Sequence, residues 1–163
     1  MNIHAERGRK RTLLLLSTYI AFIALASCTR QQPANSPQYE AVTDIRDTME
    51  LIIDPAVDVI WDSAGSIITQ AGEQDLAPTT PQAWAKVKAA AAVLAESGNL
   101  LMMPGRSAGP DWDEHANGLI ASGKLAMAAA QQQDARALFD AGGRIYQVCL
   151  ACHNQYQVDN SSP

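Results

Sequence analysis

The amino-acid sequence predicts an all-α protein, specifically an antiparallel (up-down-up-down) four-helix bundle. Two observations favour this fold. Apolar residues recur every three or four positions along four stretches of more than twenty residues each, and alanine and leucine abound while runs of β-branched residues are scarce. Because a helix with one apolar stripe cannot bury that stripe alone, four such helices are expected to pack around a shared core.

The first helix is expected over residues 39–64. Pro55 interrupts it, so the helix either kinks there or restarts with Asp54 as its cap and Pro55 in its first turn. The connection over residues 65–79 shows no clear pattern. The apolar stripe of this helix is expected to comprise Val42, Ile45, Met49, Ile52, Ala56 and Val59.

The second and third helices are expected over residues 81–102 and 110–132. Pro81 and Pro110 each suit a first helical position, and Pro104 ends the second helix. The second stripe comprises Trp84, Val87, Ala91, Leu94, Gly98 and Leu101. The third comprises Trp112, Ala116, Leu119, Gly123, Ala126 and Ala130.

The fourth helix, over residues 134–156, carries the one motif with specific chemistry. Its segment Cys149-Leu150-Ala151-Cys152-His153 has the Cys-x-x-Cys-His spacing at which c-type haem is attached. Residues three and four apart share one face of a helix, so both thiols could bond the vinyl groups of one porphyrin while His153 ligates the iron. The expected cofactor is one covalent haem c. The stripe of this helix comprises Leu138, Gly142, Ile145, Cys149, Cys152 and Tyr156.

Three other interpretations of these cysteines are weaker. A thiol-disulfide oxidoreductase would place them between a strand and a helix, and no strand pattern is visible. A zinc site needs about four ligands, and only His115 is available elsewhere after residue 28. A structural disulfide would be strained on a helix and would leave His153 without a role.

Residues 1–27 have the layout of a bacterial export signal. Four basic residues between Arg7 and Arg11 precede an apolar segment, and Leu25-Ala26-Ser27-Cys28 resembles the lipobox of bacterial lipoproteins. The resemblance implies cleavage before Cys28 and a lipid on its thiol, which anchors the protein at the periplasmic face of a membrane. Thr29 favours the outer membrane by analogy. An ordinary signal or a short uncleaved anchor is the alternative.

The domain organisation follows from this signal. Residues 28–38 contain two prolines and no large apolar residue, so we expect a flexible linker. A four-helix haem domain over residues 39–158 and a disordered tail over residues 159–163 complete the chain.

The charge of the chain bears on its partners. The signal holds four of the 12 basic residues and one of the 17 acidic residues, so the remainder carries a formal charge of −8. This acidity excludes a nucleic-acid-binding protein that works by charge. Four acidic residues recur along the first helix, either as a docking face for a basic redox partner or as an ordinary solvated face. They are Asp47, Glu50, Asp54 and Asp58.

The haem motif on the last of four predicted helices resembles the class II cytochromes c, the cytochrome c-prime group. Tyr156, three residues past His153, fits the family, whereas Gln157 stands where a basic residue is usual. In that family the sixth iron position decides function. A methionine from the first helix gives an electron carrier, and an open position gives a protein that binds nitric oxide or carbon monoxide. The resemblance also implies that dimers occur.

Four side chains are expected at the haem end of the bundle and so compete for the sixth position. They are Met49, Met102, Met103 and His115, while Met127 falls at the far end. Met49 is the preferred ligand because it lies on the stripe of the first helix, with packing in the core as the alternative. The sequence thus predicts a non-enzymatic one-electron carrier with His/Met ligation. A gas-binding haem protein and a periplasmic thiol-disulfide oxidoreductase are the alternatives.

Overall fold

The structure, a computed structural model, describes residues 39–157, and this part of the chain is mainly helical. The expected all-α class is therefore confirmed. The chain divides into two units between Gln38 and Tyr39. The predicted export signal, Cys28, the linker and the tail after residue 157 lie outside the described residues.

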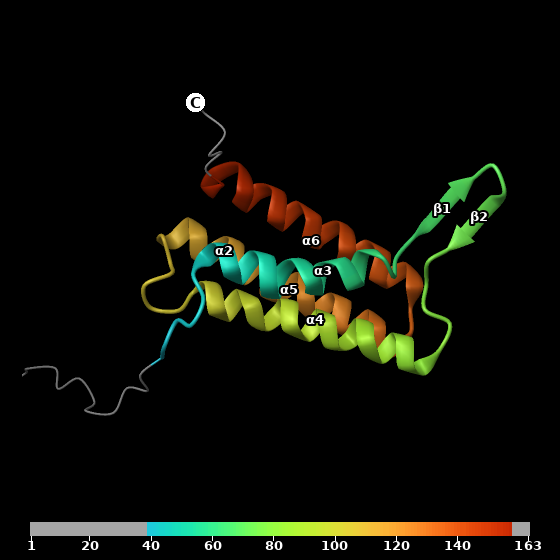
Figure 1. The fold of residues 1–163 in the computed structure, drawn as a ribbon, viewed down its shortest axis with the longest axis horizontal. Helices are drawn as coiled ribbons and strands as arrows, with labels where there is room; N and C mark the ends of the chain where they lie inside the picture. The colour runs from blue at the N-terminus through green and yellow to red at the C-terminus, as the bar shows by residue number, and fades with distance from the viewer. Residues whose placement is uncertain (1–38, 158–163) are drawn as a thin grey trace, which may run out of the picture. The chain divides into compact units, whose positions relative to one another are not determined.

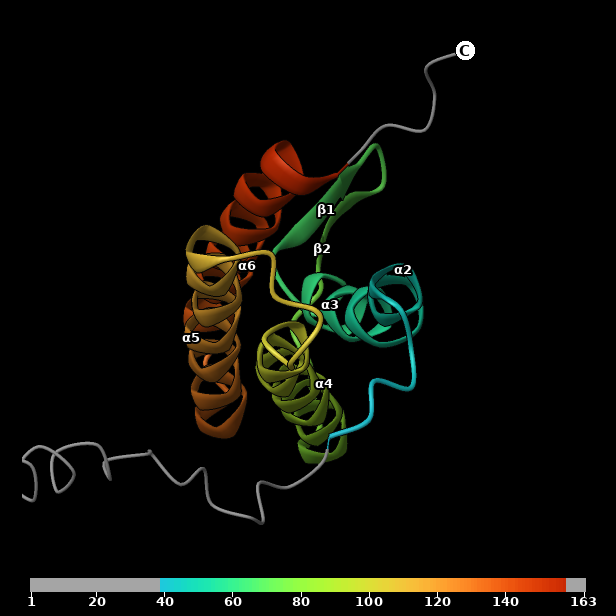
Figure 2. The same cartoon turned by 90° about the vertical axis from the view of Figure 1, so that its left-hand side faces the viewer.

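The helical segments follow one another in chain order and lie side by side (Figure 1). Figure 2, turned by 90°, shows α4 between the α2–α3 run and α5, while α6 packs against α5 and also contacts α3. Their bounds are α2 Ile45–Thr48, the π-helix η2 Met49–Ile53, α3 Asp54–Trp61, α4 Pro81–Leu101, α5 Pro110–Gln132 and α6 Ala135–Tyr156.

The apolar stripes predicted for α4 and α5 are confirmed, since every residue of both is buried. The stripe of α6 is buried from Leu138 to Ile145 and becomes half-buried at its last three positions. The interior is built on large aliphatic side chains from three of the helical segments, with Ile60, Leu94, Leu138 and Ile145 almost fully buried. The half-buried end of the α6 stripe carries the two cysteines.

The register predicted for the first helix is wrong. Val42 is 87% exposed because it precedes Ile45, where α2 begins, so the helix starts later than the predicted residue 39. Val59 is 37% exposed, whereas Ile53, Val57 and Ile60 are buried. The reason for this second difference is the π-helix, in which the Asp54 amide donates to the carbonyl of Met49, five residues back. Such a turn takes up more residues than an α-turn, so the apolar period changes phase along the helix.

Pro55 explains where the π-helix lies. Pro55 has no amide hydrogen, and its ring excludes the carbonyl four residues back, so an α-helical ladder is interrupted at this point. The chain continues as α3 with Pro55 in its first turn. The predicted restart with Asp54 as cap is wrong, because the backbone keeps right-handed helical dihedrals at Ile53 and Asp54 and no side chain caps α3.

Two glycines on the stripes permit close helix packing. A Cβ on Gly98 would lie 2.6 Å from the carbonyl oxygen of Ala116, and one on Gly123 would lie 2.9 Å from the Ala95 nitrogen. Neither residue lines the cavity described below. These glycines therefore bring α4 and α5 together rather than making room for a cofactor.

The segment after α3 forms a β-hairpin that the sequence did not predict. Strands β1 Ser66–Thr69 and β2 Gly72–Asp75 pair antiparallel, and all eight residues are exposed. The hairpin projects from the helical part (Figure 1). Within residues 39–157, no helix is both long and apolar enough to cross a membrane.

Hydrogen bonds bring four chain segments together at one end of the helices. The Trp112 indole, near the start of α5, donates to the carbonyl of Leu101 at the end of α4 over 2.8 Å. Arg106, in the connection between these helices, donates to the carbonyl of Thr43 before α2 over 2.6 Å. Gln155, near the end of α6, accepts a hydrogen bond from His115 of α5 over 3.2 Å. This is the end at which the sequence places a cofactor.

Candidate functional site

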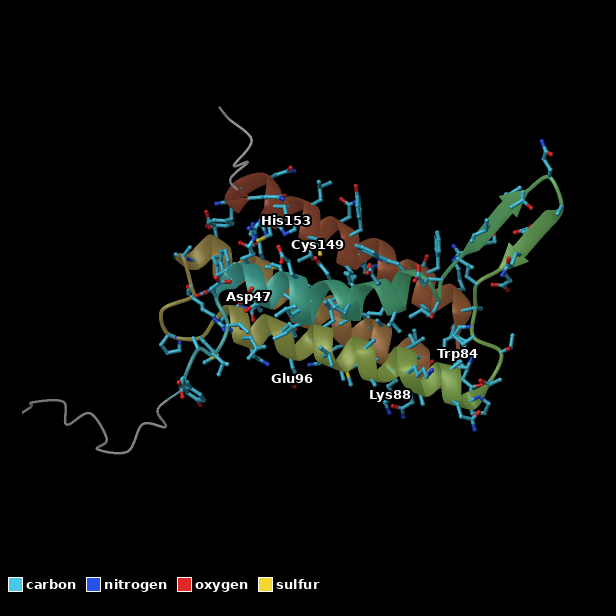
Figure 3. The ribbon with its side chains drawn as sticks, in the orientation of Figure 1. Asp47, Trp84, Lys88, Glu96, Cys149 and His153 are labelled. Atoms are coloured by element: carbon cyan, nitrogen blue, oxygen red, sulfur yellow. The ribbon has the colours of Figure 1, made fainter. Side chains whose placement is uncertain are left out.

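A cavity of about 530 Å³ lies between the last turns of α6 and the α2–α3 run. Cys149, Cys152 and His153 of α6 line it, and Figure 3 shows Cys149 and His153 on that part of the helix. Met49 lines it from the first helix and His115 from α5. The structure therefore brings together all three residues of the predicted haem motif and two of the four proposed ligands for the sixth position.

The two cysteines are half-buried free thiols on one side of α6. Burial raises the pKa of Cys149, and the neighbouring charges of Cys152 and Asp54 raise it further. Burial also raises the pKa of Cys152. Disulfide oxidoreductases need a thiol whose pKa is lowered, because the thiolate is the nucleophile. Both shifts run in the opposite direction and disfavour that function.

A second cavity of about 320 Å³ adjoins the first at the same end of the molecule. Met49, Asp54, Cys152 and His153 line both cavities. Met49 is half-buried, and His153 is exposed at the surface of α6. A soft thioether and an imidazole thus approach one space from two different helices, which is a donor set found around haem iron.

His115 has partners of its own at the wall of the larger cavity. Its Nε2 donates to Oε1 of Gln155 over 3.2 Å. Its ring meets that of Tyr156 edge-on with 6.2 Å between centroids, and Tyr156 in turn meets Trp112 at 5.1 Å. These contacts hold His115 against α6 at the edge of the cavity.

The other methionines lie away from the site. Met102 packs partly buried against the core, and Met103 sulfur lies 3.9 Å from Nη1 of Arg106. Neither lines either cavity. Met127 also packs against the core, so of the methionines weighed as ligands only Met49 faces the cavities.

Arg106 is held by hydrogen bonds to two other chain segments. It donates to the carbonyl of Leu100 over 3.1 Å and to both oxygens of Thr43. Its guanidinium therefore ties the connection between α4 and α5 to the chain entering α2, and its Nε is buried without a partner.

Two aromatic residues at the other end of the cavity were not recognised from the sequence. Trp61 and Tyr146 line the cavity and meet edge-on with 6.4 Å between ring centroids. The Trp61 indole donates to the carbonyl of Gly142 over 3.2 Å, which fixes α3 on α6. Trp61 lies off the apolar period predicted for the first helix, and only its size and its place at the helix end signalled a role.

Two acidic side chains also line the larger cavity. Asp54 and Asp58 face it from α3, although both are largely solvent-exposed. Apolar side chains such as Ile53, Val57 and Leu119 form the inner wall. The cavity thus has an apolar interior and an acidic rim.

The lining of the larger cavity is compatible with a haem. Within the described range, no three His, Cys, Asp or Glu side chains gather closely enough to hold a metal ion, so the zinc interpretation gains no support. A volume of about 530 Å³ falls in the range of sites for small molecules and cofactors, roughly 300–1,000 Å³. Two thiols, an imidazole and a thioether around such a space fit a covalently attached porphyrin.

No protein family, curated protein or solved structure matches this chain.

Proposed function

We propose that this protein is a lipid-anchored periplasmic c-type cytochrome that transfers one electron at a time and has no enzymatic activity. In this proposal the described helices form an antiparallel four-helix bundle around one covalent haem c. The observation that carries the proposal is that Cys149, Cys152 and His153 line one cavity with Met49.

The residues of α6 would hold the cofactor in one orientation. Cys149 and Cys152 are three residues apart on one side of the helix, as two thioether bonds to one porphyrin require. His153 follows directly and offers an imidazole nitrogen on the same side. When bound, the haem would supply an iron that cycles between the ferric and ferrous states.

Met49 decides between electron transfer and gas binding. A thioether ligand favours ferrous iron, raises the reduction potential and leaves no open position for nitric oxide or carbon monoxide. Met49 lines both cavities beside His153, whereas packing in the core alone would not require contact with either. This placement supports His/Met ligation.

The walls of the cavity support the same function. The apolar side chains of Ile53, Val57 and Leu119 keep water from the interior and make extra charge on the iron unfavourable. The exposed carboxylates of Asp54 and Asp58 at the rim offer a redox partner with a basic face an electrostatic contact.

Lipidation at Cys28 and export to the periplasm belong to the proposal on sequence grounds alone. A lipid on Cys28 would hold the domain at the membrane surface through residues 28–38, with the outer membrane favoured by Thr29. Haem c is matured outside the bacterial cytoplasm, which agrees with an export signal.

Absorption spectroscopy of the full chain, produced in cells that mature cytochromes c, tests this function. We expect low-spin ferric haem with the weak far-red band of a methionine–iron bond, and no carbon monoxide uptake after reduction. High-spin ferric haem that binds carbon monoxide once reduced would replace the electron carrier with a gas-binding protein. A protein without a Soret band would contradict both haem functions.

A further inference from the structure

The cavity wall provided by the first helix has an unusual spacing. Met49 and Asp54 line both cavities, yet they are five residues apart. An α-helix turns about 100° per residue, so residues five apart point about 140° away from each other. An α-helix could not place both side chains on this wall.

In an uninterrupted α-helix Glu50, rather than Met49, would share the wall with Asp54. Glu50 lies four residues before Asp54, which is the α-helical spacing for one face. In the structure Glu50 lines the smaller cavity beside Met49 and Asp54 but does not line the larger one. The Glu50 side chain is 57% exposed, and its carboxylate pairs with Arg46 over 3.1 Å. At the larger cavity the π-helix therefore presents a thioether where an α-helix would present a carboxylate.

Both flanks of the π-helix are held in place. On the α3 side, Ala56, Val57 and Ile60 are buried in the core. On the α2 side, Thr48 is fully buried, and its hydroxyl lies 2.8 Å from the hydroxyl of Thr43. Arg106 donates a hydrogen bond to that Thr43 hydroxyl. Neither flank can rotate without losing buried contacts, so the residues between them must absorb the mismatch.

We infer that η2 contains one residue more than an α-helix needs between these flanks, and that taking up this surplus residue as a π-turn directs Met49 at the cavity. Leu51, 66% exposed, is the surplus position. The segment Met49–Ile53 thus positions Met49, the proposed iron ligand. A test of this role by haem spectra rests on the proposed function, whereas a test by melting temperature does not.

Deletions in the full chain test this inference. Pro55→Ala, which restores the amide hydrogen that an α-helix uses, serves as the parent of three variants. Deleting Leu51 leaves Met49 and Asp54 four residues apart, about 40° from each other on an α-helix, which is the orientation that the π-turn provides. Deleting both Glu50 and Leu51 leaves Met49 and Asp54 three residues apart and turns Met49 by about 100° from that orientation, to about 60° on the other side of Asp54. Deleting Glu96, exposed in the regular α-helix α4, is the control.

The expected results differ sharply between the deletions. Removing Leu51 should keep the low-spin spectrum and leave the melting temperature within about 3 °C of the Pro55→Ala parent. Removing both Glu50 and Leu51 should give a high-spin spectrum and lower the melting temperature by more than about 10 °C. Removing Glu96 should lower the melting temperature by as much. Both of these deletions rotate buried residues out of the core.

The opposite pattern overturns the inference. If the Leu51 deletion lowers the melting temperature and gives a high-spin spectrum as the double deletion does, η2 holds no surplus residue. If the double deletion keeps a low-spin spectrum, the π-turn does not direct Met49. If the protein carries no haem, the proposed function fails separately. The melting temperatures then decide the inference, with a tolerated Leu51 deletion supporting it and a damaging one contradicting it.

Discussion

Met49 in η2 and His153 in α6 line the same two cavities from different helices, although 103 positions separate them in the sequence. The π-turn brings Met49 to this wall, and the last turn of α6 brings His153. The proposed function depends on this pair of residues and on the packing that supports them.

Replacing Met49 by leucine should convert low-spin haem to high-spin haem. Leucine fills a similar volume without a sulfur atom, so the fold should survive at a cost below about 1.5 kcal/mol. Met102→Leu is the matched control, because Met102 packs against the core and lines neither cavity. Visible spectra of both variants measure the effect. Identical low-spin spectra would remove Met49 from the iron.

The thiols of the haem-free chain should react slowly with iodoacetamide near neutral pH. Burial raises the pKa of Cys149, with the charges of Cys152 and Asp54 adding to the shift, so the thiolate forms only at a pH above the usual range. Asp54→Asn should lower the pKa of Cys149, measured from the pH dependence of its alkylation. Asp58→Asn serves as the control, since Asp58 also lines the cavity.

The raised pKa of Cys149 makes the stability of the haem-free chain depend on pH. Below the pKa of an unfolded thiol both states are protonated, and Cys149 has no effect on stability. As the pH rises through that value the unfolded chain loses its proton first, so the free energy of unfolding falls until the folded thiol titrates as well. Urea titrations of the haem-free chain should show this loss at alkaline pH, and Cys149→Ala should reduce it.

Substituting Gly98 by alanine should destabilise the fold. The new Cβ would lie 2.6 Å from the Ala116 carbonyl oxygen and 2.5 Å from Cγ1 of Ile120, so α4 and α5 must move apart at a cost of about 1–3 kcal/mol. Gly143→Ala is the control, because Gly143 is exposed on α6 and the new Cβ would have no atom within 4 Å. It should stabilise the helix by up to about 1 kcal/mol. Equal shifts in thermal unfolding would contradict this packing.

Truncating Arg106 should loosen the end of the molecule that holds the site. Arg106→Ala removes the bonds to Thr43 and Leu100, leaving carbonyl groups without that partner, and should cost about 1–3 kcal/mol. Arg136→Ala provides a control, because its guanidinium is 83% exposed in an i,i+4 pair with Asp140. Chemical denaturation of the two variants measures the difference. Equal losses would show that Arg106 holds nothing in place.

Three of the four predicted helices could be located from the sequence because each is one uninterrupted α-helix. The stripes of α4 and α5 follow the 3.6-residue period without a break, and the proline-marked starts at Pro81 and Pro110 coincide with the observed helix starts. The paired thiols of α6 share one side for the same reason. Local periodicity is sufficient wherever the helix keeps one geometry.

The first helix and the hairpin show where this reasoning stops. A π-turn shifts the period within a helix, and a template with a fixed period misassigned Val59 while overlooking Ile53. The hairpin turns at Gln70 and Ala71, which lack the Asn-Gly or Asp-Gly signal of tight hairpins. Trp61 reached the cavity because tertiary contact with Gly142 placed it there, and no local pattern encodes that contact.

Mass spectrometry of the denatured full chain, produced together with a cytochrome c maturation system, tests the central claim most directly. The account predicts a coloured protein whose mass exceeds that of the processed chain by one haem, and a Cys149→Ala/Cys152→Ala variant that carries none. A colourless protein with two alkylatable thiols at Cys149 and Cys152 would contradict the account.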